Sequence, residues 1–163
     1  MEEPSAIHNT FVIERNFPVS PERVFSAFAD TAQKRRWFIE SGSSTVEHYE
    51  MDFRVGGRER ACVRLGKTTP LAGVACINEI VYLDIVPNRR IVFASTMSLE
   101  TKCISASLGT VELLSTEAGT EMIFTHQAAF FEGADGPQMR EAGWRSLFDK
   151  LEAELSTLEH ASR

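Results

Sequence analysis

The amino-acid sequence predicts an α+β fold of the helix-grip type, in which a curved antiparallel sheet wraps around a long C-terminal helix. Three observations predict it. A strand pattern and two short helical patterns open the chain, and residues 44–131 then consist almost entirely of strands and turns. The last pattern is an amphipathic helix, whose apolar stripe needs a large apolar partner surface. The expected element order is β-α-α-β(6)-α.

The first strand and a helical insert occupy the start of the chain. Residues 10–17 alternate between apolar and polar side chains, which indicates a strand. Ser20 and Pro21 form a helix start, with Ser20 as the N-cap and Pro21 at the first helical position. Asp30 caps a second short helix, and Gly42 closes the insert. The apolar positions of the two helices are Val24, Phe25, Phe28, Trp37 and Phe38.

Six further strands and their turns follow. Pro87 and Asn88 mark a turn, as do residues 117–119, and each turn joins two strand patterns into a hairpin. Consecutive strands with short polar connections imply an antiparallel meander. The predicted strands are 44–49, 57–65, 75–86, 91–97, 105–114 and 120–130.

The C-terminal helix follows Pro137 and should run for roughly five turns. Its apolar residues recur at intervals of three and four, so one face must be buried, and the sheet is the only large surface available. The apolar stripe is Trp144, Leu147, Phe148, Leu151, Leu155 and Leu158. Charged residues are expected mostly on the opposite, solvent-facing side: Arg140, Glu141, Arg145, Asp149, Lys150, Glu152 and Glu154.

Composition and charge limit the possible partners. A chain of 163 residues, 43% hydrophobic and 25% charged, predicts a single globular domain over residues 1–163. Its net charge of -6 argues against binding to nucleic acid or to an anionic membrane surface. No apolar stretch approaches the length of a membrane span, and the acidic first residues do not resemble a signal peptide. Three widely spaced cysteines are expected to be reduced thiols, which predicts a cytoplasmic location.

No metal-binding or catalytic motif is found. The four histidines, His8, His48, His126 and His160, are scattered, so we expect no metal and no cofactor. His126 stands out because it shares a strand face with Met122 and Phe124. Two interpretations are open: an acid or base inside a cavity, or a hydrogen-bonded strand histidine.

Two other features allow two interpretations each. Arg54, Arg58, Arg60 and Arg64 are spaced to share one strand face, which is either a solvent face paired with glutamates or a basic rim that recruits an acidic partner. Gly143 lies inside the last helix, where glycine costs about 1 kcal/mol relative to alanine. It provides either close approach of the helix to the sheet or room for a ligand.

Six stretches resemble the activator of heat-shock protein 90 ATPase (AHSA-type) family. They occur in the family's order over about residues 10–158, which makes the resemblance specific although each stretch is weak alone. This family belongs to the START-like SRPBCC superfamily, which also includes polyketide cyclases and the birch pollen allergen. The stretches are 10–15, 18–28, 36–38, 51–57, 84–92 and 143–144.

The resemblance implies a hydrophobic cavity between the sheet and the last helix. Members bind lipids, hormones or polyketides, catalyse cyclisation or dehydration, or stimulate a chaperone ATPase. We therefore expect a small apolar or amphipathic ligand and no catalysis. The alternatives are a cyclase or dehydratase that uses His126 and, behind both, a co-chaperone. Monomer and homodimer are both open. The expected ligand-binding residues are Trp37, Phe38, Phe53, Phe93, Met97, Phe124, His126, Trp144, Leu147, Phe148 and Leu151.

Overall fold

The computed structural model describes residues 2–161, and the side chains of residues 2–157. Its element order confirms the predicted β-α-α-β(6)-α fold, with a π-helical turn (η1) added after α2. Leu158 and His160 lie outside the described side chains. The elements are β1 (Ile7–Phe17), α1 (Pro21–Ala29), α2 (Thr31–Lys34), η1 (Arg35–Ile39), β2 (Thr45–Met51), β3 (Arg58–Arg64), β4 (Ala75–Val86), β5 (Arg90–Leu99), β6 (Lys102–Thr116), β7 (Gly119–Phe130) and α3 (Pro137–Ala161).

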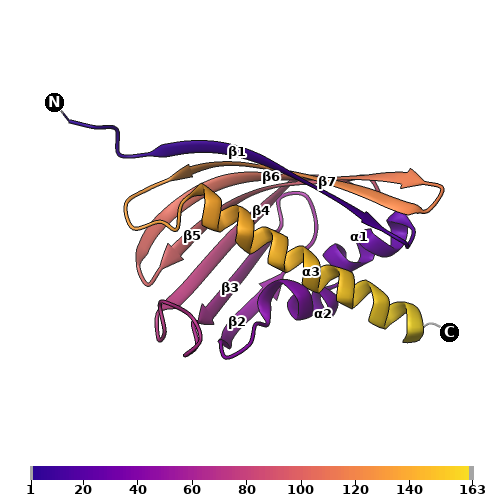
Figure 1. Cartoon of the computed structure of the whole chain (residues 1–163), viewed down its shortest axis with the longest axis horizontal. Helices are drawn as coiled ribbons and strands as arrows, with labels where there is room; N and C mark the ends of the chain where they lie inside the picture. Colours follow the sequence, from indigo (N-terminus) through magenta and orange to yellow (C-terminus); the bar gives the residue numbers. More distant parts are fainter. Residues whose placement is uncertain (1, 162–163) are drawn as a thin grey trace.

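The seven strands form one curved antiparallel sheet in the order β1-β7-β6-β5-β4-β3-β2 (Figure 1). Strands β2 to β7 follow one another as the predicted meander, and both predicted hairpins are present. The first strand starts at Ile7, three residues before the predicted start, and pairs along its whole length with β7. No helix within residues 2–161 is long and apolar enough to cross a membrane.

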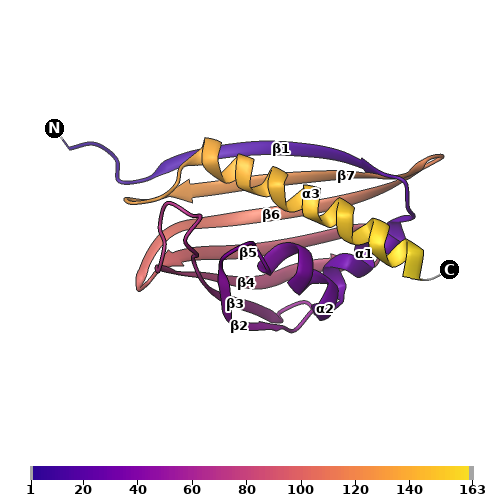
Figure 2. The ribbon, with the colours of Figure 1, turned by 60° about the horizontal axis from the view of Figure 1, so that its bottom comes forward.

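Helix α3 lies across the concave face of the sheet, with α1 and α2 beside it (Figure 2). Phe148, Leu151 and Leu155 of its apolar stripe are buried in the core, as the spacing predicts. The helix has 25 residues and so exceeds the predicted five turns. The helix packs against α1 and η1, and its first half covers the part of the sheet described below.

The prediction that the charged residues of α3 mostly face solvent is wrong for two of them. Arg140 and Glu154 are each only 7% exposed. Arg140 binds Asp135 through two nitrogens, and Glu154 accepts a hydrogen bond from Arg36 at 2.5 Å. Buried charges are tolerated because each has an opposite charge in contact. The sequence did not reveal the partner of Glu154, since Arg36 lies 118 residues away in the chain.

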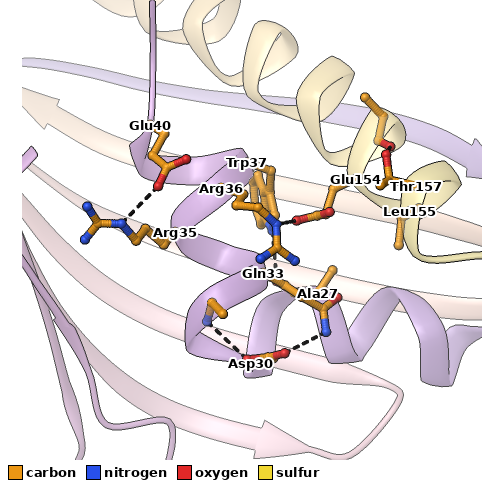
Figure 3. Close-up of polar contacts among 12 residues, drawn as sticks. Ala27, Asp30, Gln33, Arg35, Arg36, Trp37, Glu40, Glu154, Leu155 and Thr157 are labelled. Carbon is orange, nitrogen blue, oxygen red and sulfur yellow. Dashed lines mark hydrogen bonds and ion pairs between the residues drawn. The ribbon is translucent and has the colours of Figure 1, made fainter. Parts of the chain in front are cut away.

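Hydrogen bonds at its caps and at Trp37 hold the helical insert together. Ser20 accepts a hydrogen bond from the backbone N–H of Arg23 at 3.2 Å, and Asp30 accepts one from Ala32 at 3.1 Å, as the N-cap predictions require. The second helix is not continuous, because its last turn widens into η1. The indole of Trp37 donates to the carbonyl of Ala27 at 2.8 Å (Figure 3).

Two of the four arginines predicted to share one strand face form solvent-exposed ion pairs. Arg60 pairs with Glu79 at 3.1 Å, and Arg64 pairs with Glu47. Arg54 differs, since it precedes β3 and pairs with Asp52 in its own loop. The prediction of one shared strand face is therefore wrong for Arg54.

A buried ion pair joins the helical insert to the sheet. The Lys34 ammonium of α2 lies 2.8 Å from a carboxylate oxygen of Glu59 on β3, and both side chains are almost completely buried. Tyr82 also binds the same carboxylate, Tyr49 donates to its second oxygen at 3.1 Å, and Lys34 donates to Tyr82 at 3.1 Å. Burial, followed by the charge of Glu59, raises the pKa of both tyrosines. The phenols therefore stay protonated and donate to Glu59.

Removing one partner of this pair should destabilise the fold strongly. We expect Lys34→Met to lower the free energy of unfolding by about 3–5 kcal/mol, because it leaves Glu59 buried without its cation. The double variant Lys34→Met/Glu59→Gln should recover most of the loss. The matched control is Arg60→Met, which removes an exposed pair and should cost less than about 1 kcal/mol. Chemical denaturation measures all three, and similar losses for Lys34→Met and Arg60→Met would contradict the prediction.

Candidate functional site

A cavity of about 310 Å³ lies between the concave face of the sheet and the first half of α3. The sheet supplies its floor, α3 its roof, and η1 one side wall. Its size falls at the lower end of the range for small-molecule sites. The lining residues are Phe38, Asn78, Ile80, Phe93, Ser95, Met97, Ser107, His126, Asp135, Met139, Arg140, Gly143, Trp144 and Leu147.

The cavity exists because the inward positions of two central strands carry small side chains. Ser95 on β5 pairs in register with Ser107 on β6, and their hydroxyls are 2.9 Å apart. Two residues further along β6 is Gly109, which faces Phe93. A Cβ at this position would lie 2.3 Å from the tip of the Phe93 ring, so only glycine fits there. These small side chains leave space between the sheet and α3.

Aromatic side chains form the apolar walls. Trp144 lies at their centre, with ring centroids 5.6 Å from Phe38 and 6.5 Å from Phe93. The Lys34 ammonium lies over the ring of Phe38, 4.8 Å from the ring centroid. The buried Lys34–Glu59 pair therefore supports a wall of the cavity.

His126 is a buried histidine whose Nδ1 has no hydrogen-bond partner within the described residues. The side chain is 1% exposed, and its ring stacks on Phe11 with centroids 4.6 Å apart. Burial lowers its pKa to about 4, and the nearby Arg140 contributes in the same direction. The imidazole is therefore neutral at pH 7. This finding contradicts the interpretation of His126 as a hydrogen-bonded strand histidine.

Arg140 and Asp135 close one end of the cavity as a neutral pair. Nε and Nη2 of Arg140 each lie 2.8 Å from one carboxylate oxygen of Asp135. Nη2 also donates to Ser105 at 2.9 Å, and the guanidinium lies over the ring of Phe130 at 5.1 Å. This bidentate geometry fixes the first turn of α3 and leaves no net charge at this end.

The structure brings together six of the eleven residues predicted from the sequence as ligand-binding. The other five lie outside the cavity lining. The indole of Trp37 donates a hydrogen bond to the carbonyl of Ala27, and Phe53 packs against Phe25 and Tyr82. Those lining the cavity are Phe38, Phe93, Met97, His126, Trp144 and Leu147. The remaining three, Phe124, Phe148 and Leu151, fill the core behind the cavity, where other large inward-facing residues surround them.

Several lining residues were missed by sequence reasoning, which searched only for large apolar and catalytic side chains. Asn78, Ser95 and Ser107 face the cavity from three strands, and Arg140 and Asp135 close its end. A signal was present for the floor. Ser105, Ser107 and Gly109 are alternate residues of one predicted strand, so their small side chains share a face.

The chemistry available in the cavity is that of a neutral, hydrogen-bonding pocket. Among the side chains of residues 2–157, no three His, Cys, Asp or Glu residues are grouped to hold a metal ion. The hydrogen bonds of the described residues include none between His126 and a carboxylate, hydroxyl or thiol that would orient it as a general base.

The buried neutral state of His126 should make stability depend on pH. As pH falls from 6.5 towards 4, the imidazole gains a proton in the unfolded chain but not in the folded one, so stability decreases. A pKa difference of one unit corresponds to about 1.4 kcal/mol. We therefore expect the free energy of unfolding to fall by about 3 kcal/mol more for wild type than for His126→Phe over this interval. Urea denaturation at several pH values measures the difference. Parallel pH profiles for the two proteins would contradict it.

Gly143 is not required for close packing. A Cβ at this position would meet nothing within 4 Å, so the helix does not need glycine to approach the sheet. We expect Gly143→Ala to raise the free energy of unfolding by about 1 kcal/mol, the helix-propensity difference. Thermal and urea denaturation would show it. A loss of stability would mean that the helix depends on glycine after all.

Comparisons with known proteins place this cavity in a family context. The family described as "Activator of Hsp90 ATPase homolog 1-like protein" matches residues 18–156. No curated protein matches the chain.

Solved structures of bacterial proteins are similar over nearly the whole chain. An uncharacterised protein from Rhizobium leguminosarum is 38% identical, with 94% of this chain and 97% of that chain covered and a TM-score of 0.87. A protein from Rhizobium loti is 43% identical, with 93% and 99% covered and a TM-score of 0.83. An AHSA1-like protein from Aeromonas hydrophila, 19% identical, has the same fold, with 93% and 94% covered and a TM-score of 0.67. The predicted resemblance is confirmed: this chain belongs to the AHSA1-like family of START-like proteins.

Proposed function

We propose that this protein binds one small amphipathic molecule in the cavity beneath α3 and does not change it chemically. The observation that carries the proposal is a cavity of about 310 Å³ that combines aromatic walls with a few polar side chains, among them His126, Ser95 and Ser107. Apolar cavities with a few convergent polar groups are the usual form of small-molecule sites.

The arrangement of the polar groups supports an amphipathic rather than a purely apolar ligand. Ser95 and Ser107 lie on the floor, Asn78 lies beside them, and Arg140 with Asp135 closes one end. Trp144, Leu147 and the other apolar residues of the lining offer apolar contact. A molecule with one polar side and one apolar side would satisfy both surfaces, because buried polar groups need partners.

A cyclase or dehydratase is less well supported. A general base works best with a pKa near the operating pH, and burial holds the pKa of His126 at about 4.

The proposal places the protein in the cytoplasm, since its three cysteines are unpaired, as is usual in a reducing compartment.

A co-chaperone role is the second candidate, and the family description is the observation that favours it. Such a role would use the outer surface of the domain, so it would not require the cavity. Stimulation of the ATPase of a heat-shock protein 90 by the purified chain tests it directly. A stimulation that survives blocking of the cavity would favour this role over ligand binding.

Native mass spectrometry of the freshly purified protein tests the proposal. We expect a small molecule to add mass under native conditions and to be released on denaturation. Ser107→Phe should abolish the added mass, because the new ring enters the cavity from the floor.

The matched control is Leu108→Phe. Leu108 is the next residue of β6, so its side chain leaves from the opposite face of the sheet. This variant should keep the added mass. If Ser107→Phe carries the same added mass as wild type, the molecule is bound elsewhere and the proposal is wrong.

A further inference from the structure

We propose that the ligand is an uncharged molecule about two rings in size, which carries a hydroxyl group that hydrogen-bonds to the imidazole of His126. This inference rests on the proposed function and deepens it. Four properties of the cavity lead to it: its volume, its walls, the unpartnered histidine and the absence of net charge among its polar groups.

The volume and walls set the size and shape of the ligand. An apolar cavity of about 150 Å³ holds one benzene molecule. At about 310 Å³, this cavity has room for roughly two rings. Trp144 and Phe93 both line the space, with ring centroids 6.5 Å apart. Aromatic side chains favour offset or edge contacts with other rings, so a flat ligand fits these walls.

The unpartnered imidazole sets the polar group. A neutral imidazole has one N–H donor and one acceptor nitrogen. Nδ1 of His126 is covered by protein and has no partner within the described residues, whereas the ring lines the cavity, so Nε2 is the nitrogen that a ligand reaches. A hydroxyl can donate or accept, so it satisfies His126 in either tautomer. The Phe11 ring fixes the imidazole plane on one side, which leaves its orientation determined before a ligand binds.

A second hydrogen-bonding position lies on the floor. In the Ser95–Ser107 contact, one hydroxyl donates to the other, so the accepting hydroxyl keeps its own hydrogen free. Ser107 lies two residues before Gly109, which pairs in register with His126. The two polar positions are therefore neighbours on one face of the sheet, and a flat molecule can reach both.

The charges around the cavity favour an uncharged ligand. Arg140 is the cation of the cavity lining, and two of its nitrogens already bind Asp135. Asp135 also lines the cavity, so a ligand carboxylate would approach a like charge. The remaining polar side chains of the lining, including Asn78, are neutral. A buried charge without its own partner is strongly disfavoured.

Three probes with the same two-ring skeleton separate these requirements: naphthalene, naphthol and naphthoate. Binding to the full chain is measured by NMR titration of the ¹⁵N-labelled protein. We expect naphthol to bind about tenfold more tightly than naphthalene, the value of one buried hydrogen bond, and naphthoate to bind no better than naphthalene.

Variants assign the preference to His126. In His126→Phe, which keeps a ring for the stack on Phe11, the advantage of naphthol over naphthalene should disappear. Leu108→Phe, on the outer face of the sheet, should keep it. The ¹⁵N–¹H spectrum of each variant reports directly whether it is folded.

Each other outcome decides against a stated claim. If none of the three probes binds, the proposed function fails together with this inference. If naphthalene binds as tightly as naphthol, or if the preference survives in His126→Phe, the cavity binds ligands but the assignment of the hydroxyl to His126 is wrong. Tightest binding of naphthoate would overturn the inference of an uncharged ligand.

Discussion

The fold depends on burying the apolar stripe of α3 against the concave face of the sheet. Phe148, Leu151 and Leu155 bring the second half of the helix into contact with large inward residues and with the helical insert. The first half of the same helix lies over Ser95 and Ser107, where the floor is low. One rigid helix spans both regions, so it cannot collapse onto the small residues without losing contacts over the large ones. The cavity is a consequence of this mismatch.

Paired charges hold the walls of the cavity in position. Lys34 and Glu59 tie α2 to the sheet, and the same ammonium lies over the ring of Phe38. Asp135 and Arg140 tie the start of α3 to the loop before it. Each buried charge is compensated by its neighbour, so the pairs fix positions without contributing net charge to the cavity. A preorganised, neutral site of this kind loses little entropy when it binds a ligand.

Periodic patterns predicted the elements well, because the burial of one helix stripe and one sheet face imposes them directly. The contents of the cavity were harder to predict. Trp37 and Phe38 are adjacent and similar in sequence terms, yet η1 turns Trp37 into the core and Phe38 towards the cavity. The buried roles of Arg140 and Lys34 depend on tertiary partners, and Glu59 lies 25 residues from Lys34. Six of the eleven residues predicted from the sequence do line the cavity, and the alternating small residues of β6 were a further signal in the sequence that went unused.

The most direct test of this account is a crystal structure of the protein purified without denaturation. The account predicts a space between Trp144 and the Ser95–Ser107 floor. This space should contain continuous electron density for a molecule of about two rings. The polar side of this density should face His126. The contradictory result is a Trp144 side chain lying directly on Ser95 and Ser107, with no space beneath α3. That result would make the small-residue floor a packing feature and remove the basis for a ligand.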